Sequence, residues 1–295
     1  MTTLLQNVFN GLAIGSVYAL VALGFCLVHK ASGAVNFAHG SLLLLGGYLV
    51  AVLHEPLGFP LAVLAALAGT AAAALLEALV LRRVRDSSPA VPTILTIGVD
   101  ILLLTELARR IGDQVLTTGD PWGAEVVSFA GITAAQARVY SLLVAVLLVG
   151  GFLLIFRFSR WGLSMRASSL DPEAAALMGV RVDRMQLIAW ALAGAMAVVA
   201  AVFLAAFPSA GIERTTGQIA LAAFPAAVLG GLGSVGGTLL GSLVVGMAEA
   251  MATGYQQQLS GFGSGLSDLA PYLVMVLVLI ARPQGLLGSK ESSRV

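Results

Sequence analysis

Long apolar runs recur along the whole sequence and predict helices that cross a membrane. Six runs have roughly the 20 residues that span a bilayer, and they cover residues 8–28, 38–53, 60–81, 91–111, 139–157 and 185–207. Three more runs, which are shorter or rich in glycine, cover 218–231, 236–252 and 268–281. The pattern predicts an all-α, polytopic transmembrane helical bundle with about eight or nine membrane-spanning segments. We expect residues 1–295 to form a single domain, with one segment near 218–236 broken or re-entrant.

The composition places this bundle in lipid rather than in water. Hydrophobic residues make up 58% of the chain and charged residues only 11%, and the mean hydropathy is +0.95. A soluble protein of this composition would expose large apolar patches. The formal charge of +1 offers no basic surface for nucleic acid, and the single Cys26 excludes a disulfide framework.

Lys and Arg are distributed unequally over the two sides of the predicted bundle. With the N-terminus outside, the inner set is Lys30, Arg82, Arg83, Arg85, Arg157, Arg160, Arg166, Arg181, Arg184, Arg282, Lys290 and Arg294. The outer set is only Arg109, Arg110, Arg138 and Arg214. Because cytoplasmic loops carry the excess of Lys and Arg, we expect an outside N-terminus and a cytoplasmic C-terminus.

The longest charged stretch, residues 157–184, lies on the predicted inner side and contains one short predicted helix. Asp171 is a candidate N-cap, Pro172 suits the first turn, and Glu173 favours the positive end of the helix dipole. Good helix formers follow until Gly179 supplies a stop.

This helix would present small apolar residues at the spacing i, i+3, i+4, namely Ala174, Leu177 and Met178. Such a face suits docking into a groove on another protein. A surface helix lying at the lipid headgroups explains the periodicity equally well.

Glycines cluster in the segment from Val228 to Gly246. Gly233, Gly237 and Gly241 recur every four residues, which lets a neighbouring helix approach closely. A sharper hypothesis is that the flexible run Gly230, Gly231, Gly233 and Ser234 unwinds to present backbone groups to a solute.

A second polar cluster lies between the first two spans. Asn36 and His39 flank Phe37 and precede Gly40 in the string NFAHG. Polar side chains near membrane depth indicate function by default. We expect a solute path lined by both clusters, namely by Asn36, Phe37, His39, Gly40, Gly230, Gly231, Gly233 and Ser234. The alternative is that Asn36 caps the second helix while His39 satisfies a backbone carbonyl.

Asp100 is the most deeply placed acid, near the middle of run 91–111. It is a candidate for a proton relay or for an ion pair with another helix. Glu77, Glu249 and Asp268 lie nearer the ends of their segments, and we assign them no mechanistic role.

Motifs for catalysis are missing. The sequence has no G-x-x-x-x-G-K-[ST] motif, no zinc-ligand spacing and no nucleophile elbow. We therefore expect a chain that is not an enzyme and that binds neither ATP nor a metal itself.

Five ordered strings resemble the permease subunits of bacterial branched-chain amino acid ABC importers. They are GLAIGSVYALVALGFCLV, NFAHG, MRASSLDPEAAALMGV, VLGGLGSVGGTLLG and RPQGLLG, and they span residues 11 to 288. The resemblance implies a multi-pass protein of the bacterial inner membrane that is the shorter of two paired permeases. It also implies two cytoplasmic ATPase subunits that use ATP and an extracytoplasmic solute-binding protein. Residues 171–179 match the family's cytoplasmic loop that contacts the ATPase, which favours the docking hypothesis over the headgroup helix.

Two features depart from the family pattern. Asp100 stands where such permeases usually have a small or hydroxyl residue, and Pro225 interrupts the stretch before the glycines. The cargo therefore stays open between branched-chain or other small hydrophobic amino acids and urea or short amides. Hypotheses of another class are an ion-coupled carrier that uses Asp100 and a passive solute channel.

Overall fold

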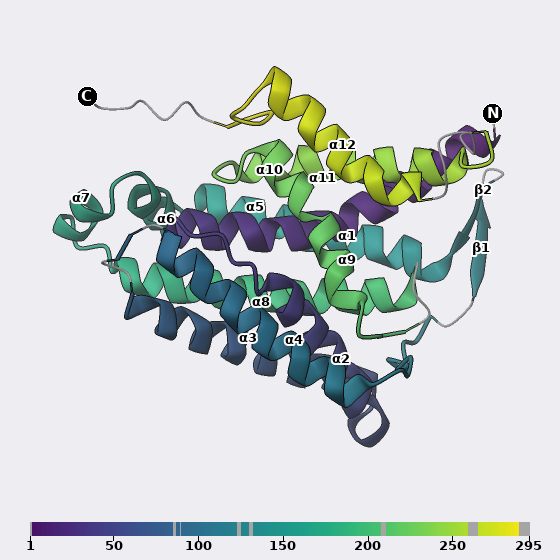
Figure 1. Cartoon of the computed structure of the whole chain (residues 1–295), viewed down its shortest axis with the longest axis horizontal. Coiled ribbons are helices and arrows are strands. Elements are labelled where there is room, and N and C mark those ends of the chain that lie inside the picture. Colours follow the sequence, from purple (N-terminus) through teal and green to yellow (C-terminus); the bar gives the residue numbers. More distant parts are fainter. Residues whose placement is uncertain are drawn as a thin grey trace.

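The computed structural model describes residues 2–84, 87–88, 90–122, 125–129, 132–207, 211–258 and 265–288. Arg85, Lys290 and Arg294, which contribute to the predicted charge asymmetry, lie outside these residues. Figure 1 shows long helices that run side by side between the two ends of the molecule. The elements in order are α1 (Thr2–Ser32), α2 (His39–Leu57), α3 (Phe59–Arg82), α4 (Ala90–Ile111), β1 (Val126–Phe129), β2 (Ile132–Ala135), α5 (Gln136–Phe158), α6 (Arg160–Leu170), α7 (Pro172–Leu177), α8 (Val182–Ala206), α9 (Thr216–Ala222), α10 (Phe224–Gly230), α11 (Val235–Gly254) and α12 (Leu266–Ala281).

Seven of the described helices are long and apolar enough to cross a bilayer: α1, α2, α3, α4, α5, α8 and α11. The segment Thr216–Gly230 and helix α12 are shorter apolar helices. The all-α polytopic bundle is therefore confirmed, with seven full-length candidate spans among the described residues against the eight or nine segments predicted.

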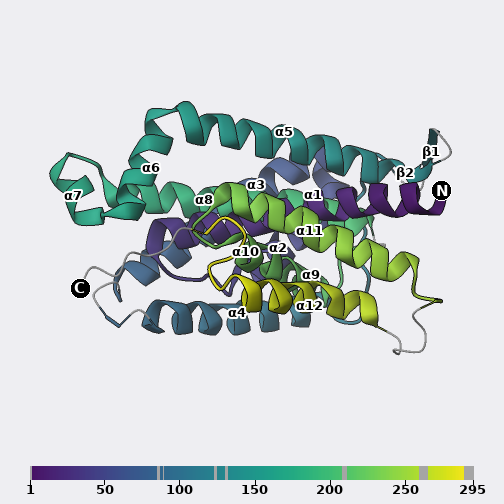
Figure 2. The same cartoon turned by 90° about the horizontal axis from the view of Figure 1, so that it is seen from above.

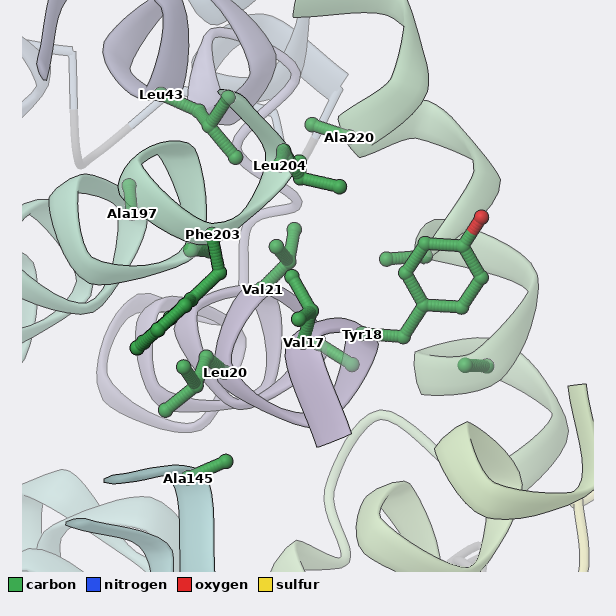
Figure 3. Close-up of a cluster of buried hydrophobic side chains, with 14 of the residues drawn as sticks. Val17, Tyr18, Leu20, Val21, Leu43, Ala145, Ala197, Phe203, Leu204 and Ala220 are labelled. Carbon is green, nitrogen blue, oxygen red and sulfur yellow. The ribbon is translucent and has the colours of Figure 1, made fainter. Parts of the chain in front are cut away.

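The core forms around α1 and α8. Within the most apolar stretch of each helix, 89% of the residues of α1 and 67% of those of α8 are buried inside the chain. The corresponding share for α4 is only 11%. Figure 3 shows Val17 and Val21 of α1 beside Phe203 and Leu204 of α8. Since lipid supplies no hydrophobic force between helices, close packing of such small and branched side chains holds the bundle together.

The outer helices expose apolar side chains. Examples lie on α3, α4, α5 and α12, and they include Leu64, Leu76, Ile101, Leu102, Val146, Leu147, Leu277 and Ile280. Figures 1 and 2 show α4 and α12 on one side of the bundle, with α9 and α10 between them. These surfaces suit lipid or another membrane subunit.

The predicted break near 218–236 is confirmed. Helix α9 ends at Ala222 and α10 begins at Phe224, with Ala223 between them. Pro225 lies in the first turn of α10 and has no N–H to donate to the carbonyl of Leu221. Proline therefore separates two short helices within one membrane segment.

The two ends of the bundle differ (Figure 1). One end carries the antiparallel hairpin of β1 and β2, in which Val126 pairs with Ala135 and which the all-α prediction did not contain. The other end carries α6 and α7. The prediction of one helix in 157–184 was incomplete, because Ser159 caps an additional helix by accepting a hydrogen bond from the N–H of Gly162 over 3.0 Å.

Candidate functional site

Helix α2 begins inside the bundle rather than at its end. Its first residue, His39, is fully buried and packs against Gly24 of α1, where an added Cβ would lie 2.4 Å from the imidazole ring. Gly24 precedes the end of α1 at Ser32 by about two helical turns, or roughly 12 Å. Residues 33–38, which we call the re-entrant segment, therefore return from the end of α1 into the membrane-spanning region.

Asn36 fastens the re-entrant segment. Its Nδ2 donates a hydrogen bond to Oε2 of Glu77 on α3 over 3.2 Å, and its Oδ1 accepts one from the N–H of Ala38 over 2.8 Å. The N-cap position of α2 is Ala38 itself. Asn36 thus stabilises the start of α2 from two residues upstream.

Thr96 of α4 holds the same segment from the other side. Its Oγ1 accepts a hydrogen bond from the N–H of Phe37 over 3.1 Å and lies 3.2 Å from the carbonyl oxygen of Val35. An unwound backbone has unpaired polar groups, and each unpaired group is costly in lipid. Side chains from α3 and α4 supply the missing partners.

His39 is held by packing. Its ring meets Phe25 edge-on at 4.7 Å between centroids. Neither ring nitrogen has a hydrogen-bond partner among the described residues, although the carbonyl of Val21 lies nearby.

Asp100 lies beside Ser41, in the first turn of α2, and is half-buried. A carboxylate near a helix N-terminus interacts favourably with the helix dipole and with N–H groups that lack intrahelical partners. The side chain of Asp100 also lies close enough to Glu77 for the two carboxyl groups to interact electrostatically. The acid that the sequence singled out therefore lies near the re-entrant segment.

The re-entrant segment meets the break between α9 and α10. Phe224, the first residue of α10, lies 5.4 Å from Phe25 and 5.9 Å from Phe37 between ring centroids. An added Cβ at Gly40 would lie 2.7 Å from the carbonyl oxygen of Gly217, so the start of α2 and α9 touch through their backbones. The start of α2 thus meets the break between α9 and α10 within the bundle.

The glycine cluster lies elsewhere. Gly231 has a φ of 92° in the turn between α10 and α11, and Ser234 caps α11 by accepting from the N–H of Gly237 over 3.1 Å. The carbonyl of Gly233 accepts a hydrogen bond from Lys30 near the end of α1 over 3.0 Å. This turn therefore lies beside the last turn of α1, at the end of the bundle.

Close packing by the glycines is confirmed for two of the three positions. An added Cβ at Gly237 would lie 2.0 Å from the carbonyl oxygen of Gly230, and one at Gly241 would lie 2.2 Å from that of Ala226. At Gly233, by contrast, an added Cβ would have no described atom within 4 Å.

Helix α7 has the predicted caps. Oδ1 of Asp171 accepts a hydrogen bond from the N–H of Ala174 over 2.9 Å, and Pro172 and Glu173 occupy the first turn. Gly179 has a φ of 85°, and the N–H of Val180 reaches the carbonyl of Ala175 over 3.0 Å, which closes a Schellman motif.

The apolar face of α7 is exposed. Leu177 and Met178 are 89% and 85% exposed, Ala174 is exposed as well, and only Ala175 of this helix is buried. Figures 1 and 2 place α7 beyond the ends of the long helices.

Helix α6 connects α7 to the bundle. The guanidinium of Arg166 on α6 stacks on Phe156 of α5 at 5.4 Å and donates to the Phe156 carbonyl. Gly162 also lies against that carbonyl, where an added Cβ would be 2.0 Å away. A displacement of α7 would therefore reach α5 through α6.

Sequence reasoning missed Glu77 and Thr96. Position along the chain placed Glu77 near the end of its own helix, which suggested easy solvation. The structure instead buries it at 4% exposure, against Asn36. A signal was nevertheless present in the sequence. Glu77 and Asn36 are an acid and an amide in or beside neighbouring apolar segments, and such side chains need polar partners within a membrane.

Comparisons with known proteins agree over nearly the whole chain. The family described as "Branched-chain amino acid transport system / permease component" matches residues 7–280. The chain is 33% identical to the Salmonella typhimurium high-affinity branched-chain amino acid transport system permease protein LivH, covering 99% of this chain and 97% of that protein. It is 31% identical to BraD of Pseudomonas aeruginosa, named likewise, covering 99% and 98%. A probable LivH of Methanocaldococcus jannaschii is 28% identical, covering 92% and 89%. No solved structure matches.

Proposed function

This chain belongs to the branched-chain amino acid transport permease family, and we propose that it is the membrane-spanning subunit of an ATP-driven importer for branched-chain amino acids. The observation that carries the proposal is the 33% identity to LivH over 99% of the chain. It is a multi-pass membrane protein of a transport family, and we place it in the bacterial inner membrane.

The proposed importer contains a second, related permease, two cytoplasmic ATPase subunits and an extracytoplasmic solute-binding protein. The exposed apolar side chains of α4 and α12, such as Leu102 and Leu277, offer the second permease a surface on one side of the bundle.

Helix α7 is the proposed contact with the ATPase. Its exposed Leu177 and Met178 form an apolar surface, and its caps keep the short helix formed before any partner binds. We assign the end of the bundle that carries α6 and α7 to the cytoplasm, and the hairpin end to the outside, in line with the distribution of Lys and Arg. ATP is used by the partner subunits.

The proposed translocation path runs along the point where the start of α2 meets the break between α9 and α10. Asn36, Phe37, His39 and Gly40 lie there with Phe224. Discontinuous helices commonly form solute sites in transporters, because they end inside the membrane and leave backbone groups available. The turn of Gly230, Gly231, Gly233 and Ser234 would lie at the cytoplasmic end of this path.

Transport then requires two states of the permease. ATP binding can drive the exchange only if the ATP-bound ATPases prefer one of them. In this scheme α7 moves with the ATPases, and α6 transmits the displacement to α5 through Phe156.

The test is solute uptake into proteoliposomes that contain this chain, a candidate second permease, the ATPases and the binding protein. We expect accumulation of labelled leucine that needs ATP and every component, with no accumulation of labelled urea. Accumulation of urea instead would replace the proposed cargo. Uptake by this chain alone would overturn the ATP-driven importer in favour of a carrier or a channel.

A further inference from the structure

A cleft of about 650 Å³ opens between α7 and the adjoining ends of α3 and α8. Three arginines line it, Arg82 at the end of α3 and Arg181 and Arg184 at the start of α8. Among the described lining residues, Glu173 and Asp183 are the carboxylates, so the three guanidinium groups outnumber them. The cleft thus carries a positive charge beside the proposed coupling helix.

Much of this positive charge lacks a protein partner. Nη2 of Arg82 donates to the backbone oxygen of Asp183 over 2.6 Å, while its buried Nε has no hydrogen-bond partner among the described residues. Within the described part of the chain, the exposed side chains of Arg181 and Arg184 form no hydrogen bond or ion pair. Arginine binds phosphate oxygens in two-pronged geometry and is less strongly hydrated than lysine.

The cleft lies where lipid headgroups are expected. Helices α3 and α8 have 24 and 25 residues, and each is about 36 Å long, which exceeds the roughly 30 Å of a hydrocarbon core. Their terminal residues therefore reach headgroup level. Leu79 and Val80, within one turn of Arg82, are exposed and offer an apolar surface for an acyl chain.

We infer that this cleft binds the phosphate of an anionic phospholipid headgroup. An acidic protein segment would match the charge but would not need the apolar surface of α3 that continues into the membrane. Pro172 and Ala176 of α7 also line the cleft. A bound headgroup would therefore bridge α7 to α3 and α8, and anionic lipid would hold the coupling helix in position. This regulatory role rests on the proposed function, whereas the binding itself does not.

Binding can be tested on the purified chain alone by native mass spectrometry. Phosphatidylglycerol should bind at least about tenfold more tightly than phosphatidylcholine with the same acyl chains, since each arginine contributes about fivefold. The double variant R181Q/R184Q should lose on the order of tenfold of this preference. The control R157Q/R160Q removes the same charge from exposed positions outside the cleft and should keep the preference.

Several outcomes would overturn the inference. An unchanged preference in R181Q/R184Q would do so, as would displacement of the lipid by millimolar inorganic phosphate, which would identify a site for a free anion. Weaker association with the ATPase at unchanged lipid preference would assign the cleft to a protein partner. If the double variant does not fold, the single variant R184Q serves, with an expected loss of about fivefold.

The regulatory role has a separate readout. In nanodiscs with the complete importer, phosphatidylglycerol should raise the uptake obtained per ATP hydrolysed, and R181Q/R184Q should remove that increase. A normal lipid preference with no effect on coupling would retain the binding site and overturn the regulatory role. Failure of uptake in every lipid would count against the proposed function and leave the binding result standing.

Discussion

The side-chain amide of Asn36 donates a hydrogen bond to the Glu77 carboxylate over 3.2 Å and so joins the re-entrant segment to α3. Both side chains are buried, and Oε1 of Glu77 has no partner among the described residues. Asn36 is therefore the hydrogen-bond partner of this carboxyl group within the described part of the chain. This pairing explains how an unwound segment persists at membrane depth.

Removing Asn36 should destabilise the protein. The variant N36A leaves the Glu77 carboxylate without its donor, so we expect the free energy of unfolding to fall by about 1–3 kcal/mol. Thermal unfolding in detergent measures this, and T70V is a matched control because buried Oγ1 of Thr70 has no hydrogen-bond partner among the described residues. In the E77L variant, the loss of unfolding free energy caused by N36A should be smaller by about 0.5–2 kcal/mol than in the wild type. Additive effects of the two changes would show that the contact contributes nothing.

Gly24 should be sensitive to a single added methyl group. In G24A the Cβ would lie 2.4 Å from the His39 ring, and such overpacking costs about 1–3 kcal/mol. The double variant G24A/H39A should recover part of that loss because the ring is gone. G98A is the control, since nothing lies within 4 Å of its new Cβ. If G24A unfolds like the wild type, α2 does not begin against Gly24.

Replacing Asp100 should weaken the start of α2 without changing the energy source of transport. We expect D100N to lower the free energy of unfolding by about 0.3–1 kcal/mol, because a charge beside the first turn is lost. Uptake in the reconstituted importer should still follow ATP and ignore a collapsed proton gradient. Uptake that requires the gradient and disappears in D100N would instead make Asp100 a coupling group.

Substitutions on α7 should reduce transport while leaving folding and membrane insertion intact. The double variant L177E/M178E places charge on two exposed side chains, so the chain should insert normally while uptake falls at least about tenfold through lost apolar contact. G179V should act similarly, because a branched residue at a φ of 85° opposes the end of α7. V126E, on the hairpin at the other end, is the control. Normal uptake by both α7 variants would remove the coupling role.

Labelling of single cysteines should report the orientation. The described chain has one cysteine, Cys26, which is buried, so the wild type should resist a membrane-impermeant maleimide. L177C should react only from the cytoplasmic side and V126C only from the outside. The reverse pattern would invert the proposed topology.

Sequence patterns predicted the long helices well, because a membrane segment must be both apolar and about 20 residues long. Local capping signals also located α7, since Asp171, Pro172 and Gly179 act within their own helix. The break before α10 was indicated by Pro225 and the short apolar run. These features depend on neighbouring residues in the chain.

The contacts of the candidate site depend instead on residues far apart in sequence. The sequence singled out Asn36 and His39 but gave no sign that Asn36 meets Glu77 or that Phe37 meets Phe224. It also grouped Gly230 and Gly231 with this site, whereas the structure places their turn beside the end of α1. Depth along one helix does not reveal which neighbour a side chain will face.

The early return of the chain after α1 constrains the order of synthesis. Asn36 and Phe37 leave the ribosome before Glu77 and Thr96, the residues that satisfy them within the membrane. We expect residues 33–38 to wait at the water-exposed surface until α3 and α4 have been inserted, and then to be drawn into the bilayer from the side. Maleimide labelling of N36C in nascent chains arrested before and after residue 111 would show this as protection gained late, and protection from the start would refute it.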